Sequence, residues 1–147
     1  MKKLAVILFF IPMFSFSQIS DQAVDFVFNH ANTIVIDTNL TLTDIAHYLQ
    51  DHGYIIDKKD KDLQSISTKP FLIWKSSNQT GVIDLWKDHG DIIITAQFSV
   101  SQFGFTSTDK MEKRGTGNVK GKLFQIVDEF AKQMAKDYET KISYLKL

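Results

Sequence analysis

The chain has 147 residues, and its 17 basic residues balance its 17 acidic ones. It contains no cysteine, which excludes disulfides, thiolate metal sites and a cysteine nucleophile. The basic excess that is typical of nucleic-acid-binding domains is missing, so we expect no nucleic-acid partner.

The N-terminus has the pattern of a secretory signal peptide. Lys2 and Lys3 precede the apolar run Leu4–Phe14, and Ser15–Ser17 offers a cleavage site of the small-x-small type. The apolar run is shorter than the roughly 17–25 residues that a membrane-spanning helix needs. We therefore expect cleavage after Ser17, a periplasmic or secreted bacterial protein without a transmembrane anchor, and a single domain over residues 18–147. Loss of the two lysines leaves a net charge of −2.

The first half of this domain alternates short elements. Ser20–Ala31 favours a short helix, although its β-branched and aromatic residues also fit a strand. Thr33–Asp37 is a β-branched run typical of a strand. Asn39–Gly53 predicts a helix, with Thr41 as its N-cap and the glycine as its left-handed end.

Two weakly alternating runs, Tyr54–Lys59 and Leu63–Lys69, predict a hairpin. Their serine, threonine and lysine content suits the edge of a sheet, where charge discourages pairing with another chain. Pro70 interrupts the pattern, and Phe71–Ser76 resumes it as a further strand.

The clearest pattern is Gly81–Val100, which reads as two strands joined by a tight turn. A His-Gly pair at the centre of the turn suits a primed turn, because both residue types tolerate positive φ. Pairing of Asp88 with Asp91 places Leu85 opposite Ile94. The face expected in the core then holds Ile83, Leu85, Ile92, Ile94, Ala96 and Phe98. The opposite, mixed face holds Val82, Asp84, Trp86, Ile93, Thr95, Gln97 and Ser99.

Beyond this hairpin the alternation changes phase. Phe103 and Phe105 indicate either a bulge near Ser101–Gln102 or a position on the mixed face. Asp109–Lys120 predicts a polar loop. Lys122–Ile142 repeats apolar residues at helical spacing, which predicts a long amphipathic helix able to cover a sheet.

These elements predict an α+β domain: an antiparallel meander sheet of five to six strands, with a short helix and a long C-terminal helix packed on one face. A helix ending in His52–Tyr54, meandering strands and a long last helix behind a signal peptide resemble small secreted bacterial domains of unknown function with a TATA-binding-protein-like or helix-grip fold. The resemblance covers residues 33–142 and implies a non-catalytic, envelope-associated domain. It transfers no functional residue.

No catalytic motif is recognisable, so we expect neither an enzyme nor a cofactor. Gly115–Lys122 looks like a phosphate-binding loop with the wrong spacing, and a solvated loop is favoured over an anion site. Asp44, His47 and Asp51 share one face of a predicted helix, but a solvated face is favoured over a metal site.

The mixed face is the candidate binding site. The residues expected on it are Trp74, Trp86, Ile93, Asp84, Gln97 and Phe103. Aromatic rings beside polar groups are typical of recognition surfaces, although residues 18–31 or a curled sheet could bury these rings as a second core. The expected function is binding or assembly in the cell envelope through this face. The alternatives are a carrier of a small apolar ligand, with a pocket between the sheet and the last helix, and a hydrolase with an unrecognised site.

Overall fold

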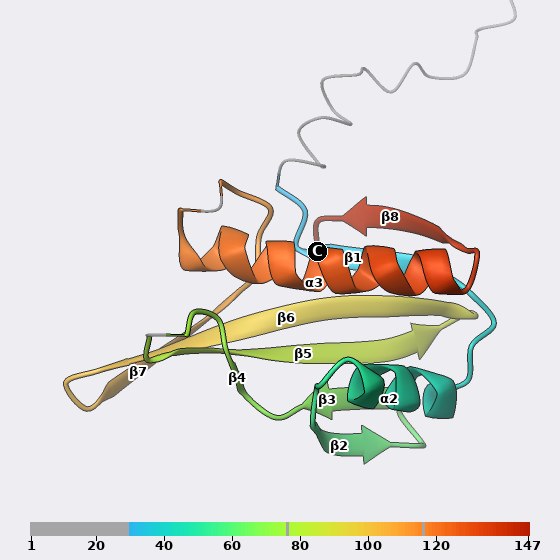
Figure 1. Ribbon diagram of the computed structural model, residues 1–147, viewed down its shortest axis with the longest axis horizontal. Coiled ribbons are helices and arrows are strands. Elements are labelled where there is room, and N and C mark those ends of the chain that lie inside the picture. The colour runs from blue at the N-terminus through green and yellow to red at the C-terminus, as the bar shows by residue number, and fades with distance from the viewer. Residues whose placement is uncertain (1–29, 76, 116) are drawn as a thin grey trace, which may run out of the picture.

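The computed structural model describes residues 30–75, 77–115 and 117–147. The signal peptide expected at residues 1–17 and nearly all of the helix expected at Ser20–Ala31 lie outside these residues. The described chain forms an antiparallel sheet with two helices (Figure 1), which confirms the α+β class. The elements are β1 Thr33–Asp37, α2 Leu42–Asp51, β2 Ile56–Asp60, β3 Ser65–Thr68, β4 Phe71–Leu72, β5 Gln79–Asp88, β6 Asp91–Gln102, β7 Phe105–Lys110, α3 Val119–Asp137 and β8 Lys141–Leu145.

The sheet has eight strands, more than the five to six that the sequence indicates. Its main order is β2-β3-β5-β6-β1-β8, with β4 paired to β5 and β7 paired to β6. The β5–β6 hairpin has the predicted register, because Asp88 pairs with Asp91 and Leu85 pairs with Ile94. His89 and Gly90 both have positive φ, as a primed two-residue turn requires.

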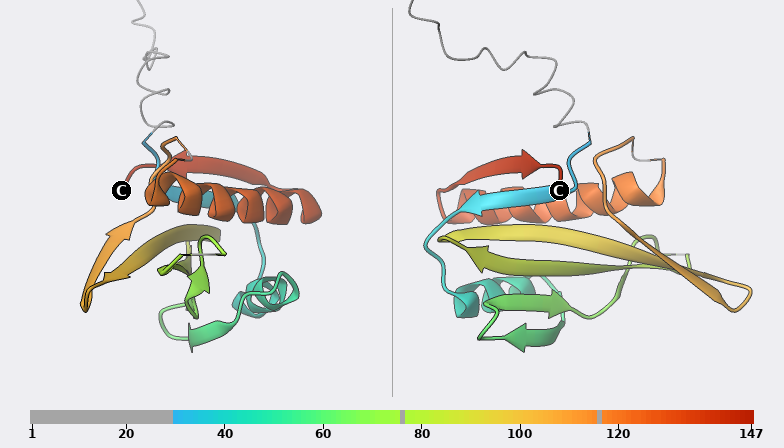
Figure 2. Two further views of the ribbon diagram at one scale, coloured as in Figure 1. Left: turned by 60° about the vertical axis from the view of Figure 1, so that its left-hand side comes forward. Right: turned by 180° about the vertical axis from the view of Figure 1, so that it is seen from behind.

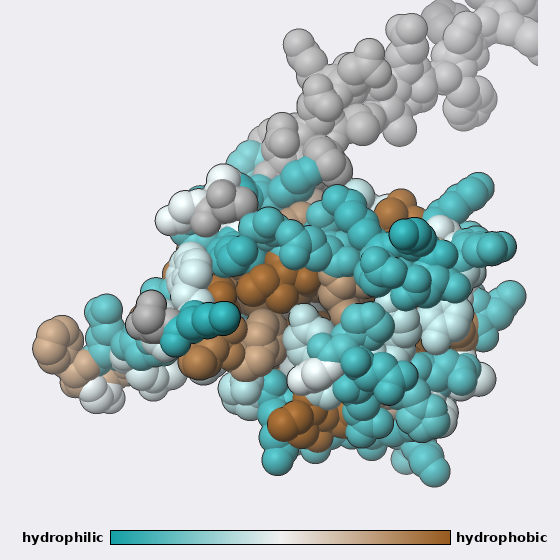
Figure 3. Space-filling view, viewed as in Figure 1, coloured by the Kyte–Doolittle hydropathy of each residue, from teal (hydrophilic) through white to brown (hydrophobic). Residues whose placement is uncertain are grey.

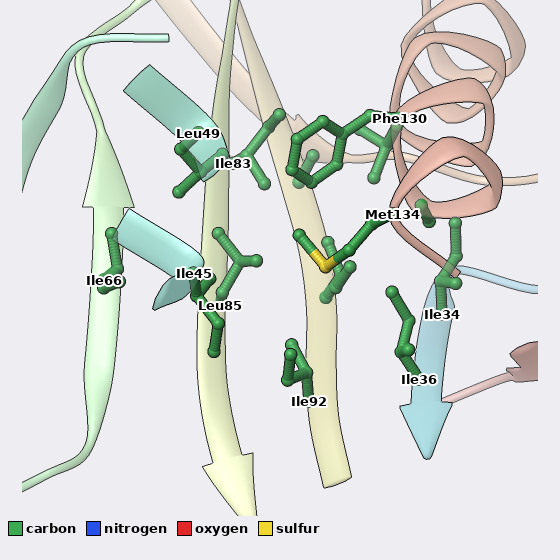
Figure 4. Close-up of a cluster of buried hydrophobic side chains, with 14 of the residues drawn as sticks. Ile34, Ile36, Ile45, Leu49, Ile66, Ile83, Leu85, Ile92, Phe130 and Met134 are labelled. Atoms are coloured by element: carbon green, nitrogen blue, oxygen red, sulfur yellow. The ribbon is translucent and has the colours of Figure 1, made fainter. Parts of the chain in front are cut away.

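The core lies between one face of the sheet and both helices. Ile45 and Leu49 of α2 face Ile66, while Phe130 and Met134 of α3 lie over β5, β6 and β1 (Figure 4). All six residues predicted for the core face of the β5–β6 hairpin are buried. The alternation of the two strands therefore selects the face that the helices cover.

The short helix α2 begins as the sequence predicts. Thr41 and Asp44 form a capping box, in which each side chain accepts a hydrogen bond from the other's backbone. Gly53 has a φ of 82°, and the backbone N–H of Tyr54 donates to the carbonyl of Leu49. The structured helix spans Leu42–Asp51, because the residues before Thr41 belong to the connection from β1.

The prediction of one helix over Lys122–Ile142 is wrong at its C-terminal end. Helix α3 ends at Asp137, and Glu139 takes a left-handed φ of 52° that turns the chain. The following residues form β8, in which Ile142 pairs with Ile36 and Tyr144 pairs with Ile34 of β1. Pairing with β1 satisfies backbone groups that would otherwise lie open at the sheet edge.

The bounds of one predicted strand and of one predicted loop also need correction. The strand expected at Phe71–Ser76 is reduced to β4, Phe71–Leu72, after which the chain bends. The polar loop expected at Asp109–Lys120 is shorter, since its first two residues belong to β7 and its last two to α3. No bulge interrupts the β6–β7 pairing at Ser101–Gln102, because both residues pair in continuous register with β7.

Candidate functional site

One face of the sheet carries an apolar row without helix cover among the described residues. Strand register aligns Val35 of β1 with Ile93 of β6, Ile93 with Trp86 of β5, and Trp86 with Ser65 of β3. Both helices pack on the opposite face, so β1 and β8 lie in front of α3 when the molecule is seen from behind (Figure 2). Val35 is 8% exposed, whereas Trp86 and Ile93 are partly exposed. We call this side of the sheet, centred on the Val35–Ile93–Trp86 row, the open face.

A polar network lies directly beside this apolar row. Asp84 pairs with Thr95 on one side and with Ser67 on the other. The hydroxyl of Ser67 donates to one carboxylate oxygen of Asp84. The amide nitrogen of Gln97 donates to the other oxygen at 3.2 Å. The carboxylate is therefore held in one orientation at the surface, next to an aromatic ring, which is a typical composition for a recognition surface.

The structure brings together four of the six predicted site residues. Trp86, Ile93, Asp84 and Gln97 lie on neighbouring positions of β5 and β6 on the open face. Trp74 lies elsewhere, in the bend after β4, where it packs against the hydrophobic core. Trp74 therefore contributes to the main core and not to the open face.

Phe103 lies at the end of a projecting hairpin rather than beside Trp86. It is 98% exposed, and Phe105 on the same hairpin is 81% exposed. The outer part of the β6–β7 hairpin, which we call the arm, extends away from the rest of the protein and carries apolar surface at its tip (Figure 3). This hairpin is not among the elements predicted above, although a Phe-Gly pair between two alternating runs is a turn signal that indicates it.

The glycine-rich segment before α3 has a packing role. Asn118 is the N-cap of α3, and its side-chain oxygen accepts a hydrogen bond of 2.8 Å from the backbone N–H of Gly121. A Cβ at Gly121 would lie 2.4 Å from the carbonyl oxygen of Gly115 and 2.6 Å from that of Arg114. The glycine therefore permits the loop backbone to cross the start of the helix.

Ion pairs engage two of the basic groups around this helix start. Arg114 Nε lies 2.8 Å from Glu112 Oε2, and Lys120 Nζ lies 2.5 Å from Asp109 Oδ2. The hydrogen bond from His30 is the main cause that lowers the pKa of Glu112, and Arg114 lowers it further. The pKa of Asp109 is lowered chiefly by its bond to Lys120. The carboxylates of Glu112 and Asp109 therefore neutralise positive charge that would otherwise attract an anion to the start of α3.

The three α2 residues weighed as metal ligands, Asp44, His47 and Asp51, do not form a site. Asp44 accepts hydrogen bonds from the backbone and the hydroxyl of Thr41, and these bonds lower its pKa. His47 and Asp51 lie exposed on the helix. Within the described ranges, no three histidine, aspartate or glutamate side chains lie close enough to hold a metal ion. No helix in the same ranges is long and apolar enough to cross a membrane.

The space between the sheet and α3 is filled by side chains. Leu123, Val127, Phe130 and Met134 are each at most 5% exposed. The ring of Phe130 meets that of Tyr48 edge to face, with centroids 5.6 Å apart. This packing favours a solid core over the ligand pocket that a carrier would need.

Two tyrosines tie α3 to its neighbours. The hydroxyl of Tyr48 donates to Asp137 and that of Tyr144 donates to Asp128, each over 2.7 Å. Burial, followed by these carboxylates, raises the pKa of both phenols well above the ordinary value. Both bonds join separate elements of the fold, so their perturbed titration has a structural explanation.

Sequence comparison assigns the chain to no family. No model of a known protein family matches the sequence, and a search of curated proteins finds no significant match. The side chains of the open face are therefore the basis for a proposal of function.

Proposed function

We propose that this protein is a periplasmic or secreted, non-catalytic module that binds a protein of the bacterial cell envelope through the open face. The observation that carries the proposal is the Val35–Ile93–Trp86 row on a sheet face opposite both helices. An aromatic anchor with aliphatic neighbours is the usual centre of a binding hot spot.

The polar network supports a specific partner over simple apolar adhesion. Asp84 is fixed by Ser67 and Gln97, so it presents its remaining acceptor capacity in a defined direction. A partner with a basic or amide group can hydrogen-bond there while an apolar side chain covers Trp86. Such a partner leaves no buried polar group unpaired, which is the condition for net affinity at an interface.

The envelope assignment rests on the signal peptide and on the resemblance to secreted domains of the same element order. Both are features of the sequence, and they support a partner outside the cytoplasm. The carrier and the hydrolase have less support, because the core under α3 is filled and the shifted tyrosines serve structural hydrogen bonds.

The test is capture of partners from an envelope extract by immobilised residues 18–147. Trp86→Ala is expected to lose the captured protein while changing the melting temperature little. Tyr138→Ala is the matched control, since Tyr138 is 39% exposed at the C-terminal end of α3, on the helix side of the sheet. Equal capture by all three proteins would refute a role for the open face.

A second measurement uses fluorescence. The Trp74→Phe variant leaves Trp86 as the sole tryptophan, so acrylamide quenching reports on the open face alone. Emission that acrylamide quenches readily in the free protein, and less readily with bound partner, is expected. Protection of Trp86 in the isolated protein would mean that the ring is core and would overturn the proposal.

A further inference from the structure

The β6–β7 hairpin forms an arm that leaves the body of the protein. Every residue of β7, from Phe105 to Lys110, is exposed, and the tip residue Phe103 is almost fully so. The arm projects beyond both helices in two views of the molecule (Figures 1 and 2). From Ser99 to Thr108 it carries no charged residue.

The turn at the tip contains a residue that the fold does not favour. Phe103 has a φ of 49°, a left-handed conformation in which bulky side chains are rare. The β5–β6 hairpin has the same two-residue turn, with histidine in the equivalent place. At 98% exposure, the Phe103 ring contributes almost nothing to the core. A strained, exposed aromatic residue indicates a role outside the folding of this domain.

The outer edge of β7 is open to pairing. Among the described residues, the pairing partner of β7 is β6 alone, so alternate residues of β7 direct their backbone N–H and C=O groups away from the sheet. Folded proteins discourage pairing at such edges with charged residues. The edge strand β2 is protected in this way by Asp57, Lys58, Lys59 and Asp60. Over its first four residues β7 has no such protection.

We propose that β7 is a dimerisation edge, which pairs antiparallel with β7 of a second copy of this chain. A two-fold axis at Ser107 aligns Phe105–Asp109 with its own reverse, so Thr106 of one copy faces Thr108 of the other. The tip of each arm then lies against Asp109 and Lys110 of its partner, where Phe103 and Phe105 lose solvent exposure. A net charge of only −2 on residues 18–147 leaves little long-range repulsion between the copies.

A second copy fits this edge better than a lipid surface does. Exposed backbone groups at an open sheet edge are costly in hydrocarbon, so a membrane could accept only the turn of the arm. An antiparallel strand satisfies those groups along the whole edge, as in other cases of strand addition. An isologous pair also needs only one surface, and the register about Ser107 places the uncharged residues Thr106, Ser107 and Thr108 opposite one another.

Pairing at β7 joins the two sheets without covering the open faces. The sheet of one copy continues into that of the other, and two Trp86 rows are held in one assembly. The dimer would therefore engage a repeated partner at two points, with the gain in avidity that linked sites provide. The dimer itself does not depend on the proposed function of the open face.

The absence of cysteine makes cross-linking a direct test. Ser107→Cys puts a unique thiol on the proposed axis, where directly opposite Cα atoms are about 4.5–5.5 Å apart, within the range of a disulfide. Lys58→Cys on the charged edge strand β2 is the matched control. Under mild oxidation the Ser107→Cys protein is expected to form a covalent dimer about tenfold faster than the control, because the thiols are held together.

Charge substitution at the edge tests the register. The variant T106K/T108K places two lysine pairs opposite each other across the axis and is expected to raise the dimer dissociation constant about tenfold. T106E/T108E should do the same, while an equal mixture of the two variants should regain the affinity of the wild type. Sedimentation velocity over a concentration series measures all four samples, with circular dichroism to confirm that each variant is folded.

Several results would overturn the proposal. One is a wild-type protein that stays monomeric at every concentration, with equal oxidation rates for the two cysteine variants. Another is a dimer whose affinity is unchanged in T106K/T108K. A third is a monomer that binds vesicles of phosphatidylethanolamine and phosphatidylglycerol and loses this binding in Phe103→Asn, which would make the tip a lipid contact.

Discussion

Two asparagine substitutions at adjacent positions of β6, Ile94→Asn and Thr95→Asn, test which face of the sheet is buried. Ile94 is 0% exposed and pairs with Ile34 on one side and Leu85 on the other, on the strand that α3 covers. Ile94→Asn loses about 1.5–3 kcal/mol of apolar burial. The buried amide, left without partners, costs about 1–3 kcal/mol more. The sum of about 2.5–6 kcal/mol is a large part of the roughly 5–15 kcal/mol that stabilises a typical domain.

Thr95→Asn is the matched control. Thr95 lies one residue further along β6 on the open face, where it is partly exposed and pairs with Asp84. An asparagine amide there can donate to the carboxylate, whereas an aspartate would face a like charge, so a change within about 0.5 kcal/mol is expected. Urea denaturation followed by circular dichroism gives both free energies of unfolding. Similar losses from the two substitutions would refute the assignment of the faces.

Three further predictions concern backbone conformation and pH. Gly121→Ala should lower stability by about 1–3 kcal/mol, because its Cβ would meet loop carbonyls, whereas Gly117→Ala, with open space around it, should be tolerated in the same thermal melt. Phe103→Asn should raise stability by up to about 1 kcal/mol, because asparagine tolerates the left-handed conformation better than phenylalanine does. His89→Asn, at the equivalent turn position, should change stability less. A loss of stability in Phe103→Asn would show that the ring stabilises the fold. Burial and Asp137 raise the pKa of Tyr48, so the stability that the protonated phenol contributes is complete below the unfolded pKa of about 10 and is lost as pH rises above it. Tyr48→Phe should therefore flatten the fall in the free energy of unfolding at alkaline pH.

The parts of the fold that the sequence predicts are those where local preference and long-range packing agree. The β5–β6 hairpin has strict alternation and a turn that accepts positive φ, so face, register and turn all follow from residues 81–100. The start of α2 follows from Thr41 and Asp44, which complete a capping box within one turn of helix. Neither case requires knowledge of another part of the chain.

The end of α3 and the strand β8 could not be predicted because their signals conflict. Ile142 continues the helical spacing of α3 and also alternates with Tyr144, so it fits both a helix and a strand. The decision is made by β1, whose free edge lies alongside this segment, and by Glu139, which takes the left-handed position where glycine is usual. Without a glycine there is no local mark of the helix end.

The candidate site could be predicted only where its residues lie on adjoining strands of known register. Trp86, Ile93, Asp84 and Gln97 fall together because the β5–β6 register places them so. The positions of Trp74 and Phe103 depend on a bend and on a second hairpin, neither of which follows from the alternation.

Phe103 shows why that second hairpin matters. A primed turn favours asparagine, aspartate or glycine at its first position, and this sequence has phenylalanine there, at a cost to the fold and without burial in return. Local preference, packing and solubility all oppose the residue. A position at which every requirement of the isolated domain is violated is best explained by a contact that the isolated domain does not make. The open edge of β7 beside it provides the place for that contact, and a second copy of the chain provides the strand.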